Sequence, residues 1–331
     1  MFQEIFSDID YIVKDLKRSY KEATVWGKIL VCIIILFLLI TAFKSDNLKI
    51  KKKKPAETFD NMNEEDDKYK FTFKHNNDIY DDYYASIYDK LFYTNEKNDC
   101  EMYAIEENAN IKSDSKILDI GCGLGHHVAK LSAKGYDVLG VDQSQAMIQK
   151  AKEQYPTGDF EVMNIIPSIG YEVFEPASFS QILCLYFTIY YMNDRLTFFK
   201  QCHQWLKPGG YLVVHMVNRM NFDPIISPGN PFIISAQKFA KKRITNTKIK
   251  LDDGTKYACD FQLDEKLNQA KFVETIKFTN GKTRKHKHVL NMPQMKVISA
   301  EAKDVGFKVS SIFELKECGY DYQYLYFFEK Q

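Results

Sequence analysis

The sequence predicts an α/β fold in which buried strands alternate with helices, and three stretches indicate it. Residues 116–134 have the pattern of a short buried strand, a glycine loop and a helix. Residues 179–186 are apolar over most of their length, as in a parallel strand that is covered on both faces. Residues 207–210, Lys-Pro-Gly-Gly, end one predicted helix and reverse the chain into a strand over 211–217.

Length and composition limit the classes of protein that this chain can belong to. Its 331 residues are enough for one large domain with additions or for two small domains. With 45% hydrophobic and 14% aromatic residues it can form a sizeable core, and a net charge of +1 argues neither for nor against a polyanionic partner. The seven cysteines form no C-x-x-C pair and no zinc spacing, so we expect reduced thiols and no metal site.

The glycine loop in residues 121–125 predicts a ligand site. Three glycines let the backbone approach a ligand closely, and the helix that follows directs unpaired N–H groups at it. Asp119 lies at the carboxyl end of the preceding strand, where its carboxylate favours a cation and repels a pyrophosphate. The alternative is a glycine turn that binds no ligand.

A second carboxylate follows the next predicted strand, residues 136–141. Asp142 lies at the tip of that strand, where both ribose hydroxyls of a nucleoside can donate hydrogen bonds to it. Ser144 then caps a helix that runs to about Tyr155. The two acidic side chains and the glycine loop therefore predict a nucleoside site at one edge of a sheet.

These stretches resemble the motifs of class I S-adenosylmethionine-dependent methyltransferases. Asp119–Gly123 is similar to the first motif, D-x-G-x-G, and Gly140–Ser144 to the second. The run Trp-Leu-Lys-Pro-Gly-Gly-Tyr-Leu at residues 205–212 resembles the L-K-P-G-G-x-L motif. The resemblance covers residues 80–331 and implies a doubly wound, Rossmann-like sheet of seven strands with one strand reversed. It also implies S-adenosyl-L-methionine as the cofactor.

The resemblance, carried over position by position, implies a set of cofactor-binding residues. Asn164 stands where the family often has an aspartate that binds the adenine amino group, and its side-chain oxygen can accept the same bond more weakly. Tyr88 belongs to a tyrosine-rich helix that resembles the lid of small-molecule methyltransferases; the alternative is a core-facing aromatic. The expected cofactor-binding residues are Asp119, Gly121, Cys122, Gly123, Gly125, Asp142, Gln143, Met147, Met163, Asn164, Leu185, Tyr186 and Tyr88.

The sequence does not identify a catalytic base or a methyl acceptor. Tyr190 and Tyr191 follow the fourth strand over the expected site of methyl transfer, although both could instead pack a helix; His215 is a third candidate. Residues 218–293 predict an antiparallel insert with a hairpin turn at Asn280-Gly281. This insert is basic, and an acidic substrate, a phospholipid or RNA could use it, but nucleic acid is not strongly indicated. Because it resembles lids over small acceptors, we favour a small-molecule acceptor.

The amino-terminal part predicts a membrane anchor. Residues 29–43 carry no charge, and residues 25–28 extend the run to about the shortest length that spans a bilayer. A secretory signal peptide is the alternative, but the preceding segment is long and mixed in charge, which favours a retained single-pass anchor. Basic residues are more numerous after the span than before it, which places the carboxyl-terminal domain in the cytoplasm.

The expected organisation has four parts, and one of them contains an insert. They are an amphipathic segment over 1–24, a transmembrane helix over 25–43, a basic then acidic flexible linker over 44–78, and a methyltransferase domain over 79–331 with the substrate-side insert at 218–293. The amphipathic segment can lie on a membrane surface or be a short solvated helix. The expected function is methyl transfer by a membrane-anchored enzyme. A non-catalytic methyltransferase-like scaffold and a nicotinamide-dependent oxidoreductase remain as alternatives.

Overall fold

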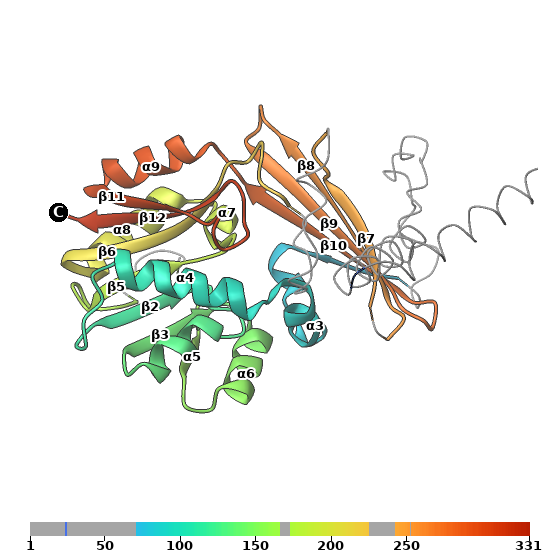
Figure 1. Ribbon diagram of the computed structural model, residues 1–331, viewed down its shortest axis with the longest axis horizontal. Coiled ribbons are helices and arrows are strands. Elements are labelled where there is room, and N and C mark those ends of the chain that lie inside the picture. Colours follow the sequence, from blue (N-terminus) through green and yellow to red (C-terminus); the bar gives the residue numbers. More distant parts are fainter. Residues whose placement is uncertain (1–23, 25–70, 166–172, 225–241, 252) are drawn as a thin grey trace, which may run out of the picture. The chain divides into compact units, whose positions relative to one another are not determined.

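The computed structural model describes residues 24, 71–165, 173–224, 242–251 and 253–331 (Figure 1). The chain divides into two compact units, Met1–Asp66 and Asp67–Gln331. The elements described below all belong to the second unit.

A seven-stranded sheet forms the centre of this unit, in the strand order β11-β12-β6-β5-β2-β3-β4 (Figure 1). Six strands point the same way, and β12 runs antiparallel to both of its neighbours. This is the doubly wound, Rossmann-like α/β sheet with one reversed strand that the motifs imply. The strands are β2 (Lys116–Ile120), β3 (Asp137–Asp142), β4 (Asp159–Val162), β5 (Phe179–Cys184), β6 (Leu206–Val217), β11 (Phe307–Glu314) and β12 (Gln323–Lys330).

Helices cover both faces of this sheet because successive side chains of each strand point to opposite faces. Ile117 packs in a core with α4, α5 and α6, while Leu118 packs in a second core with α7, α8 and α9. Leu183 and Ile182 of β5 divide between the same two cores. The helices are α4 (Asn95–Asn108), α5 (His126–Ala133), α6 (Gln145–Gln154), α7 (Thr188–Tyr191), α8 (Arg195–Trp205) and α9 (Met295–Asp304).

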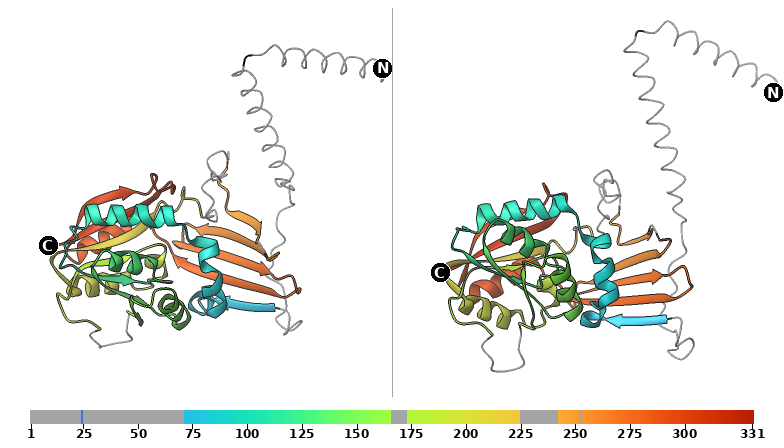
Figure 2. Two further views of the ribbon diagram at one scale, coloured as in Figure 1. Left: turned by 60° about the horizontal axis from the view of Figure 1, so that its bottom comes forward. Right: turned by 90° about the horizontal axis from the view of Figure 1, so that it is seen from below.

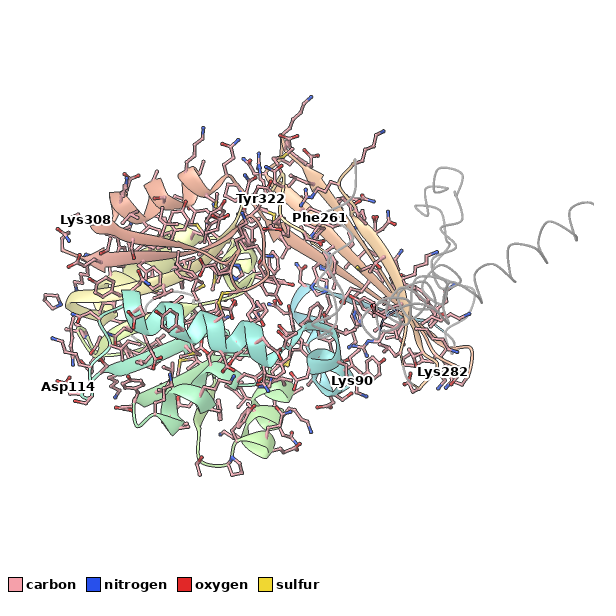
Figure 3. The ribbon with its side chains drawn as sticks, in the orientation of Figure 1. Lys90, Asp114, Phe261, Lys282, Lys308 and Tyr322 are labelled. Carbon is pink, nitrogen blue, oxygen red and sulfur yellow. A yellow bond between two sulfur atoms is a disulfide. The ribbon has the colours of Figure 1, made fainter. Side chains whose placement is uncertain are left out.

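A second sheet has the strand order β1-β10-β9-β8-β7, and all its pairs are antiparallel except β1 with β10. Four of its strands come from the predicted insert, and the hairpin between β9 and β10 turns at Asn280-Gly281, where Phe278 and Lys282 pair through their backbones. Figure 3 shows Phe261 at the end nearer the seven-stranded sheet and Lys282 at the opposite end. The strands are β1 (Phe71–His75), β7 (Asn246–Lys250), β8 (Lys256–Asp264), β9 (Gln269–Lys277) and β10 (Thr283–Asn291).

Ordered structure begins earlier than the sequence indicates. Residues 71–78, predicted to be part of a flexible linker, form β1 and the 3-10 helix η2 (Asn76–Ile79). The backbone of β1 pairs with the edge strand β10, and Ile79 is fully buried. Helix α3 (Asp82–Phe92) follows and packs between the two sheets, against Leu124 and Met147 on one side and the side chains of β8 and β9 on the other (Figure 2).

The expectation that all cysteines are reduced is wrong for one pair. Cys100 in α4 and Cys318 in the connection from β11 to β12 form a disulfide across a sequence separation of 218 residues. Sequence spacing gives no sign of such a pair because the fold alone brings the two Cα atoms to 5.6 Å. Cys122, Cys184, Cys202 and Cys259 are free.

The predicted localisation, a single-pass membrane protein with a cytoplasmic catalytic domain, is contradicted. Among the described residues, no helix is long and apolar enough to cross a membrane. The longest of them, α4, has 14 residues. At about 1.5 Å per residue it is shorter than the roughly 30 Å of a hydrocarbon core. Apart from Thr24, the predicted segments 1–24 and 25–43 lie outside the described residues.

Reducing the disulfide between Cys100 and Cys318 should lower the free energy of unfolding by about 2–4 kcal/mol, because the cross-link restricts the unfolded chain. Urea unfolding with and without a thiol reductant measures the change. The double variant Cys100→Ser/Cys318→Ser should match the reduced wild type and should not respond to reductant. A response of that variant equal to that of the wild type would contradict the cross-link.

Candidate active site

A single cavity of about 450 Å³ lies at the carboxyl ends of β2, β3 and β5 and extends to the second sheet. Ligands of doubly wound sheets bind at this edge. The glycine loop, the lid elements η2 and α3, and the side chains of β8, β9 and β10 form its walls. One cavity therefore joins the predicted nucleoside site with a second compartment that the insert completes.

Backbone hydrogen bonds between neighbouring strands fix the glycine loop. The N–H groups of Gly121 and Cys122 both donate to the Val141 carbonyl, at 2.8 and 3.1 Å. The Gly123 N–H donates to the Asp142 carboxylate at 3.1 Å. Gly123 has a φ of +56°, and a Cβ built on it would meet no atom within 4 Å. The loop therefore presents bare backbone to the cavity, at a position that favours glycine.

Asp142 holds the tip of β3 in place and keeps acceptor capacity toward the cavity. Its Oδ1 accepts the Ser144 N–H at 2.9 Å while Oδ2 accepts the Gly123 N–H. Burial raises the pKa of Asp142, and these two backbone hydrogen bonds oppose the rise. Each carboxylate oxygen can accept a further hydrogen bond, so two vicinal hydroxyls of a ribose fit this side chain.

Asp119 is a buried carboxyl group, 2% exposed, at the end of β2. Burial raises its pKa to about 6; His127 opposes the rise, and the charges of Asp142 and Glu101 add to it. A cation in the cavity would stabilise the ionised carboxylate. The amino group and sulfonium of S-adenosylmethionine supply such a charge, so the edge of the sheet fits a nucleoside with a cationic tail.

The lid contacts the cofactor edge through several hydrogen bonds, among them one from Asn77 of η2 to the Gln143 side chain at 3.2 Å. The Ser144 hydroxyl, which also caps α6, donates to the Tyr80 carbonyl at 2.5 Å. His126, the first residue of α5, lies 2.7 Å from the Asp89 carboxylate of α3. The lid is therefore held by residues that directly follow the glycine loop and the tip of β3, the two places that would hold the cofactor.

A polar cluster lies beneath the floor of the cavity. Lys97 of α4 is buried, lies 3.1 Å from a Glu101 oxygen, and has its Nζ 3.2 Å from the centre of the Tyr186 ring. The other Glu101 oxygen lies 3.2 Å from His127 Nε2. Tyr186 has a φ of +52°, a strained value for a bulky residue that the cation and its surroundings hold at the end of β5.

The structure brings together nearly all of the expected cofactor-binding residues. Gly125 is the exception, because it packs against Phe160 and does not line the cavity. Tyr88 of α3 lines the cavity together with its neighbour Tyr84, most of whose side chain is buried in the core. The expected residues that line the cavity are Asp119, Gly121, Cys122, Gly123, Asp142, Gln143, Met147, Met163, Asn164, Leu185, Tyr186 and Tyr88.

The three candidate catalytic residues have different positions. Tyr191 lines the cavity. Tyr190 is fully buried, and its hydroxyl accepts the Val217 N–H at 2.8 Å, so it packs α7 against β6. His215 is 1% exposed and does not line the cavity; burial lowers its pKa to about 4. Of the three, Tyr191 alone is placed to contact a ligand.

Sequence reasoning missed His288 and its carboxylate partner Glu274. His286 and His288 are two positions apart in β10, so both point to one face of the sheet, and His286 pairs directly with Glu274 of β9. The spacing of the two histidines was visible, but the register that sets them beside Glu274 was not. Tyr80, Phe92, Tyr93, Asn98, His126, His127 and Thr188 also line the cavity without having been expected there.

Comparison with known proteins agrees with this geometry. Residues 118–214 match a family model described as a methyltransferase domain. The ubiquinone biosynthesis O-methyltransferase of Acinetobacter baylyi is 28% identical over 119 residues, which are 35% of this chain and 49% of that protein. The chain thus spans about half or less of the length of the curated relatives it matches.

Two solved structures share the fold. The CcbJ methyltransferase of Streptomyces caelestis has a TM-score of 0.58 and 16% identity, covering 76% of this chain and 97% of that one. An S-adenosylmethionine-dependent methyltransferase of Clostridium acetobutylicum has a TM-score of 0.55 and 18% identity, covering 75% and 98%. At these identities the likeness shows the fold alone.

These matches confirm the enzyme class and the cofactor that the motifs imply. Residues 118–214 match a methyltransferase domain, and a curated relative from Mycolicibacterium smegmatis, 27% identical over 117 residues, is named as an S-adenosylmethionine-dependent methyltransferase.

Asp142→Ala should weaken binding of S-adenosylmethionine by about 10- to 100-fold, because the variant lacks the acceptors for the ribose and a carboxylate that holds the loop. Isothermal titration calorimetry measures the dissociation constant. Asp137→Ala is the matched control, since Asp137 is exposed at the other end of the same strand. Unchanged affinity in Asp142→Ala would contradict the assignment of this strand tip to the ribose.

Asp119→Asn should raise the free energy of unfolding at pH 7 by about 3 kcal/mol while weakening cofactor binding. The folded pKa of about 6 lies above the ordinary value near 4, so wild-type stability falls as pH rises through that window. The amide does not ionise, so the gain over wild type should vanish near pH 4. Urea unfolding at both pH values tests this, and an Asn variant less stable than wild type at pH 7 would contradict it.

Proposed function

We propose that this chain transfers the methyl group of S-adenosylmethionine to a small, largely apolar acceptor. One observation carries the proposal: the cavity continues from the two acidic strand ends into a compartment that the second sheet closes. Cofactor and acceptor would thus meet within one enclosed space, as methyl transfer requires.

The second compartment is suited to an aromatic or otherwise apolar molecule. Its walls are mostly aromatic and aliphatic, with a few polar groups that can orient a ligand. Tyr80, Tyr191 and His288 supply those polar groups. The apolar walls include Phe187, Met192, Phe222, Phe261, Phe272 and Leu290.

The residues of this chain would bind and orient both reactants and exclude water. Asp142 and the Gly123 backbone would hold the nucleoside, and Asp119 would face the cationic tail. When bound, S-adenosylmethionine supplies an electrophilic methyl group on a positively charged sulfur. The aromatic walls would remove water from the reacting atoms, which strengthens the electrostatic contacts made there.

The relatives support a small acceptor without identifying it. The ubiquinone biosynthesis O-methyltransferase bears the name of a reaction on oxygen. The insert that closes the second compartment lies beyond residues 118–214, which match the family model.

The full chain should bind S-adenosylmethionine at micromolar concentration and should not bind the nicotinamide dinucleotide under the same conditions. Isothermal titration calorimetry with each ligand measures this, because Asp119 favours a cation and repels a pyrophosphate. Release of S-adenosylhomocysteine in a screen of small phenols, amines and acids then tests turnover. Preference for the nicotinamide dinucleotide would overturn the proposal, as would cofactor binding without turnover of any acceptor.

A further inference from the structure

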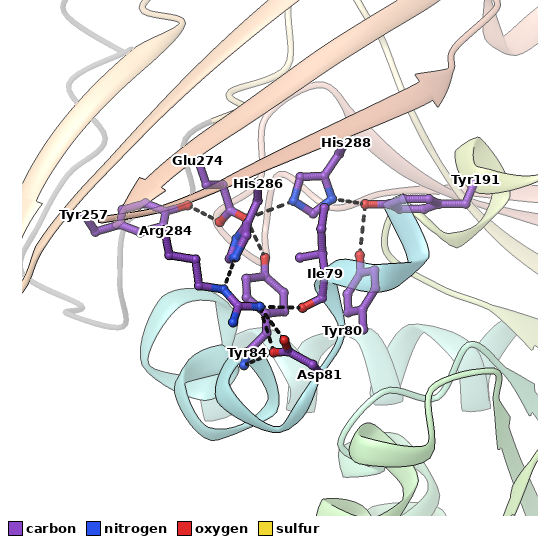
Figure 4. A network of polar contacts seen from close by, with 10 residues as sticks. All are labelled: Ile79, Tyr80, Asp81, Tyr84, Tyr191, Tyr257, Glu274, Arg284, His286 and His288. Carbon is purple, nitrogen blue, oxygen red and sulfur yellow. Dashed lines mark hydrogen bonds and ion pairs between the residues drawn. The ribbon is translucent and has the colours of Figure 1, made fainter. Parts of the chain in front are cut away.

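A buried carboxylate lies at the centre of a hydrogen-bond network next to the acceptor compartment (Figure 4). Glu274 of β9 has no exposed surface and lies within hydrogen-bonding distance of four donors. The hydroxyls of Tyr84 and Tyr257 donate to it at 3.0 and 2.5 Å. His286 Nδ1 lies 3.1 Å and His288 Nε2 2.8 Å from its Oε2. Burial raises the pKa of Glu274, but the histidine hydrogen bonds outweigh it and hold that pKa well below its usual range.

The ionised Glu274 determines which nitrogen of His288 carries the proton. A carboxylate only accepts hydrogen bonds, so His288 Nε2 is the donor and Nδ1 of the neutral ring is an acceptor. The Tyr191 hydroxyl lies 2.5 Å from that Nδ1 and donates to it. The Tyr80 hydroxyl donates in turn to Tyr191 Oη at 2.9 Å. A chain of hydrogen bonds therefore leads from the cavity through Tyr191 and His288 to Glu274.

The end of this chain that faces the cavity is accessible to a ligand. Tyr80, Tyr191 and His288 all line the cavity; Tyr80 directly follows η2, and the other two come from α7 and β10. The phenolic oxygen of Tyr191 can accept a hydrogen bond from a ligand, beside or in place of the one from Tyr80. Glu274 does not line the cavity, so it acts through side chains that contact it, of which His288 is the one linked to Tyr191.

We propose that Tyr191 and His288 remove a proton from a hydroxyl group of the methyl acceptor, with Glu274 as the positioning residue. The acceptor would be a phenol or another weakly acidic hydroxyl on an apolar molecule. This inference rests on the proposed methyl transfer and adds the base and the chemical class of the acceptor.

The proton and electron balance of the step is complete. The acceptor oxygen forms a bond to the methyl carbon as the carbon–sulfur bond breaks, and sulfur keeps the electron pair of that bond. The hydroxyl proton of the acceptor passes to Tyr191 Oη while the Tyr191 proton passes to His288 Nδ1. The resulting imidazolium is stabilised by the Glu274 carboxylate 2.8 Å away and loses its proton to water after the product leaves.

The surroundings favour a hydroxyl acceptor over an amine. An uncharged amine has a lone pair and attacks without a base, whereas a hydroxyl becomes a strong nucleophile only when its proton is removed. The four donors around Glu274 leave its carboxylate no room to hold an ammonium group. The flat aromatic walls formed by Phe261 and Phe272 match a phenol ring.

The same cluster has the composition of a metal site, but its hydrogen bonds favour the proton relay. Potential ligand atoms of Glu274, His286 and His288 lie within 4.8 Å of one another. Arg284 Nε donates to His286 Nε2 at 2.6 Å, and Arg284 also pairs with Asp81. Nε2 of a neutral His286 therefore accepts, and its proton is on Nδ1, the atom that a metal would need unprotonated.

Several titratable groups face His288. They are Tyr80, which directly follows η2, Tyr84 of α3, Tyr191 of α7, Glu274 of β9 and His286 of the same strand as His288. Burial raises the pKa of all three tyrosines, so they remain protonated donors at neutral pH.

The first test is a spectroscopic titration of the full chain with 4-nitrophenol, in the presence of S-adenosylhomocysteine. At a pH where free 4-nitrophenol is protonated, wild type should bind it as the coloured anion, because His288 accepts its proton. His288→Gln should bind it in the neutral form. Wild type that binds only the neutral form would overturn the inference, and so would failure of 4-nitrophenol to bind.

The second test is methyl transfer to a series of substituted phenols of graded acidity. His288→Gln and Tyr191→Phe should lower kcat by about 10²- to 10⁴-fold for weakly acidic phenols and much less for phenols already ionised at the assay pH. Both variants should bind S-adenosylmethionine like wild type in calorimetry, which shows that they fold. His203→Gln, away from the cavity on α8, is the matched histidine control and should keep the wild-type pH profile.

The results of these two tests distinguish a failure of the proposed proton relay from a failure of the proposed methyl transfer. Loss that is equal for all phenols, or no loss, would overturn the relay while methyl transfer stands. A dialysed wild type that holds one zinc ion per chain, lost in His288→Gln, would also overturn it in favour of a metal site. Absence of S-adenosylmethionine binding by wild type would overturn the proposed function and this inference with it.

Discussion

The parallel pairing of β2 with β3 is the constraint on which the whole site depends. It aligns Ile120 with Val141, and the backbone of the glycine loop then donates two hydrogen bonds to the Val141 carbonyl. The loop cannot take another path without leaving these donors unpaired in a buried place. Asp119 and Asp142 consequently meet at adjacent strand ends, and the capping hydroxyl of Ser144 extends the arrangement to the lid.

Two carboxyl groups that are buried to a similar degree have opposite pKa shifts, because their hydrogen-bond partners differ. Asp119 and Glu274 are both almost fully buried. Burial dominates at Asp119 and raises its pKa to about 6, whereas hydrogen bonds from His286 and His288 dominate at Glu274 and lower its pKa. A group such as Asp119 destabilises the unliganded fold and becomes favourable when a cation arrives, while Glu274 joins the lid helix to the second sheet through its hydrogen bonds with Tyr84 and His286.

The resemblance to methyltransferase motifs implied the seven strands of the central sheet. Local patterns in the sequence were enough to predict an α/β fold, because strands, caps and glycine turns depend on neighbours a few residues away. They were also enough to propose the cofactor edge, whose residues come from consecutive strand–loop–helix units. They failed where distant segments pair. The strand β1 forms only because β10 offers an edge, and Cys100 reaches Cys318 across 218 residues. Neither the pairing of β1 nor the disulfide can be predicted from the hydrophobic periodicity of the residues involved.

The amino-acid sequence by itself determined the glycine loop and the acids at the strand ends, since both are set by short-range geometry and by side-chain chemistry. Only the tertiary structure decided how the second compartment is built. Tyr190 and Tyr191 are adjacent in the chain, yet helical rotation turns one into the core and the other toward His288. Glu274 meets Tyr84 across 190 residues, through a strand register that no local pattern contains. A buried polar group must find its partners wherever the fold brings them.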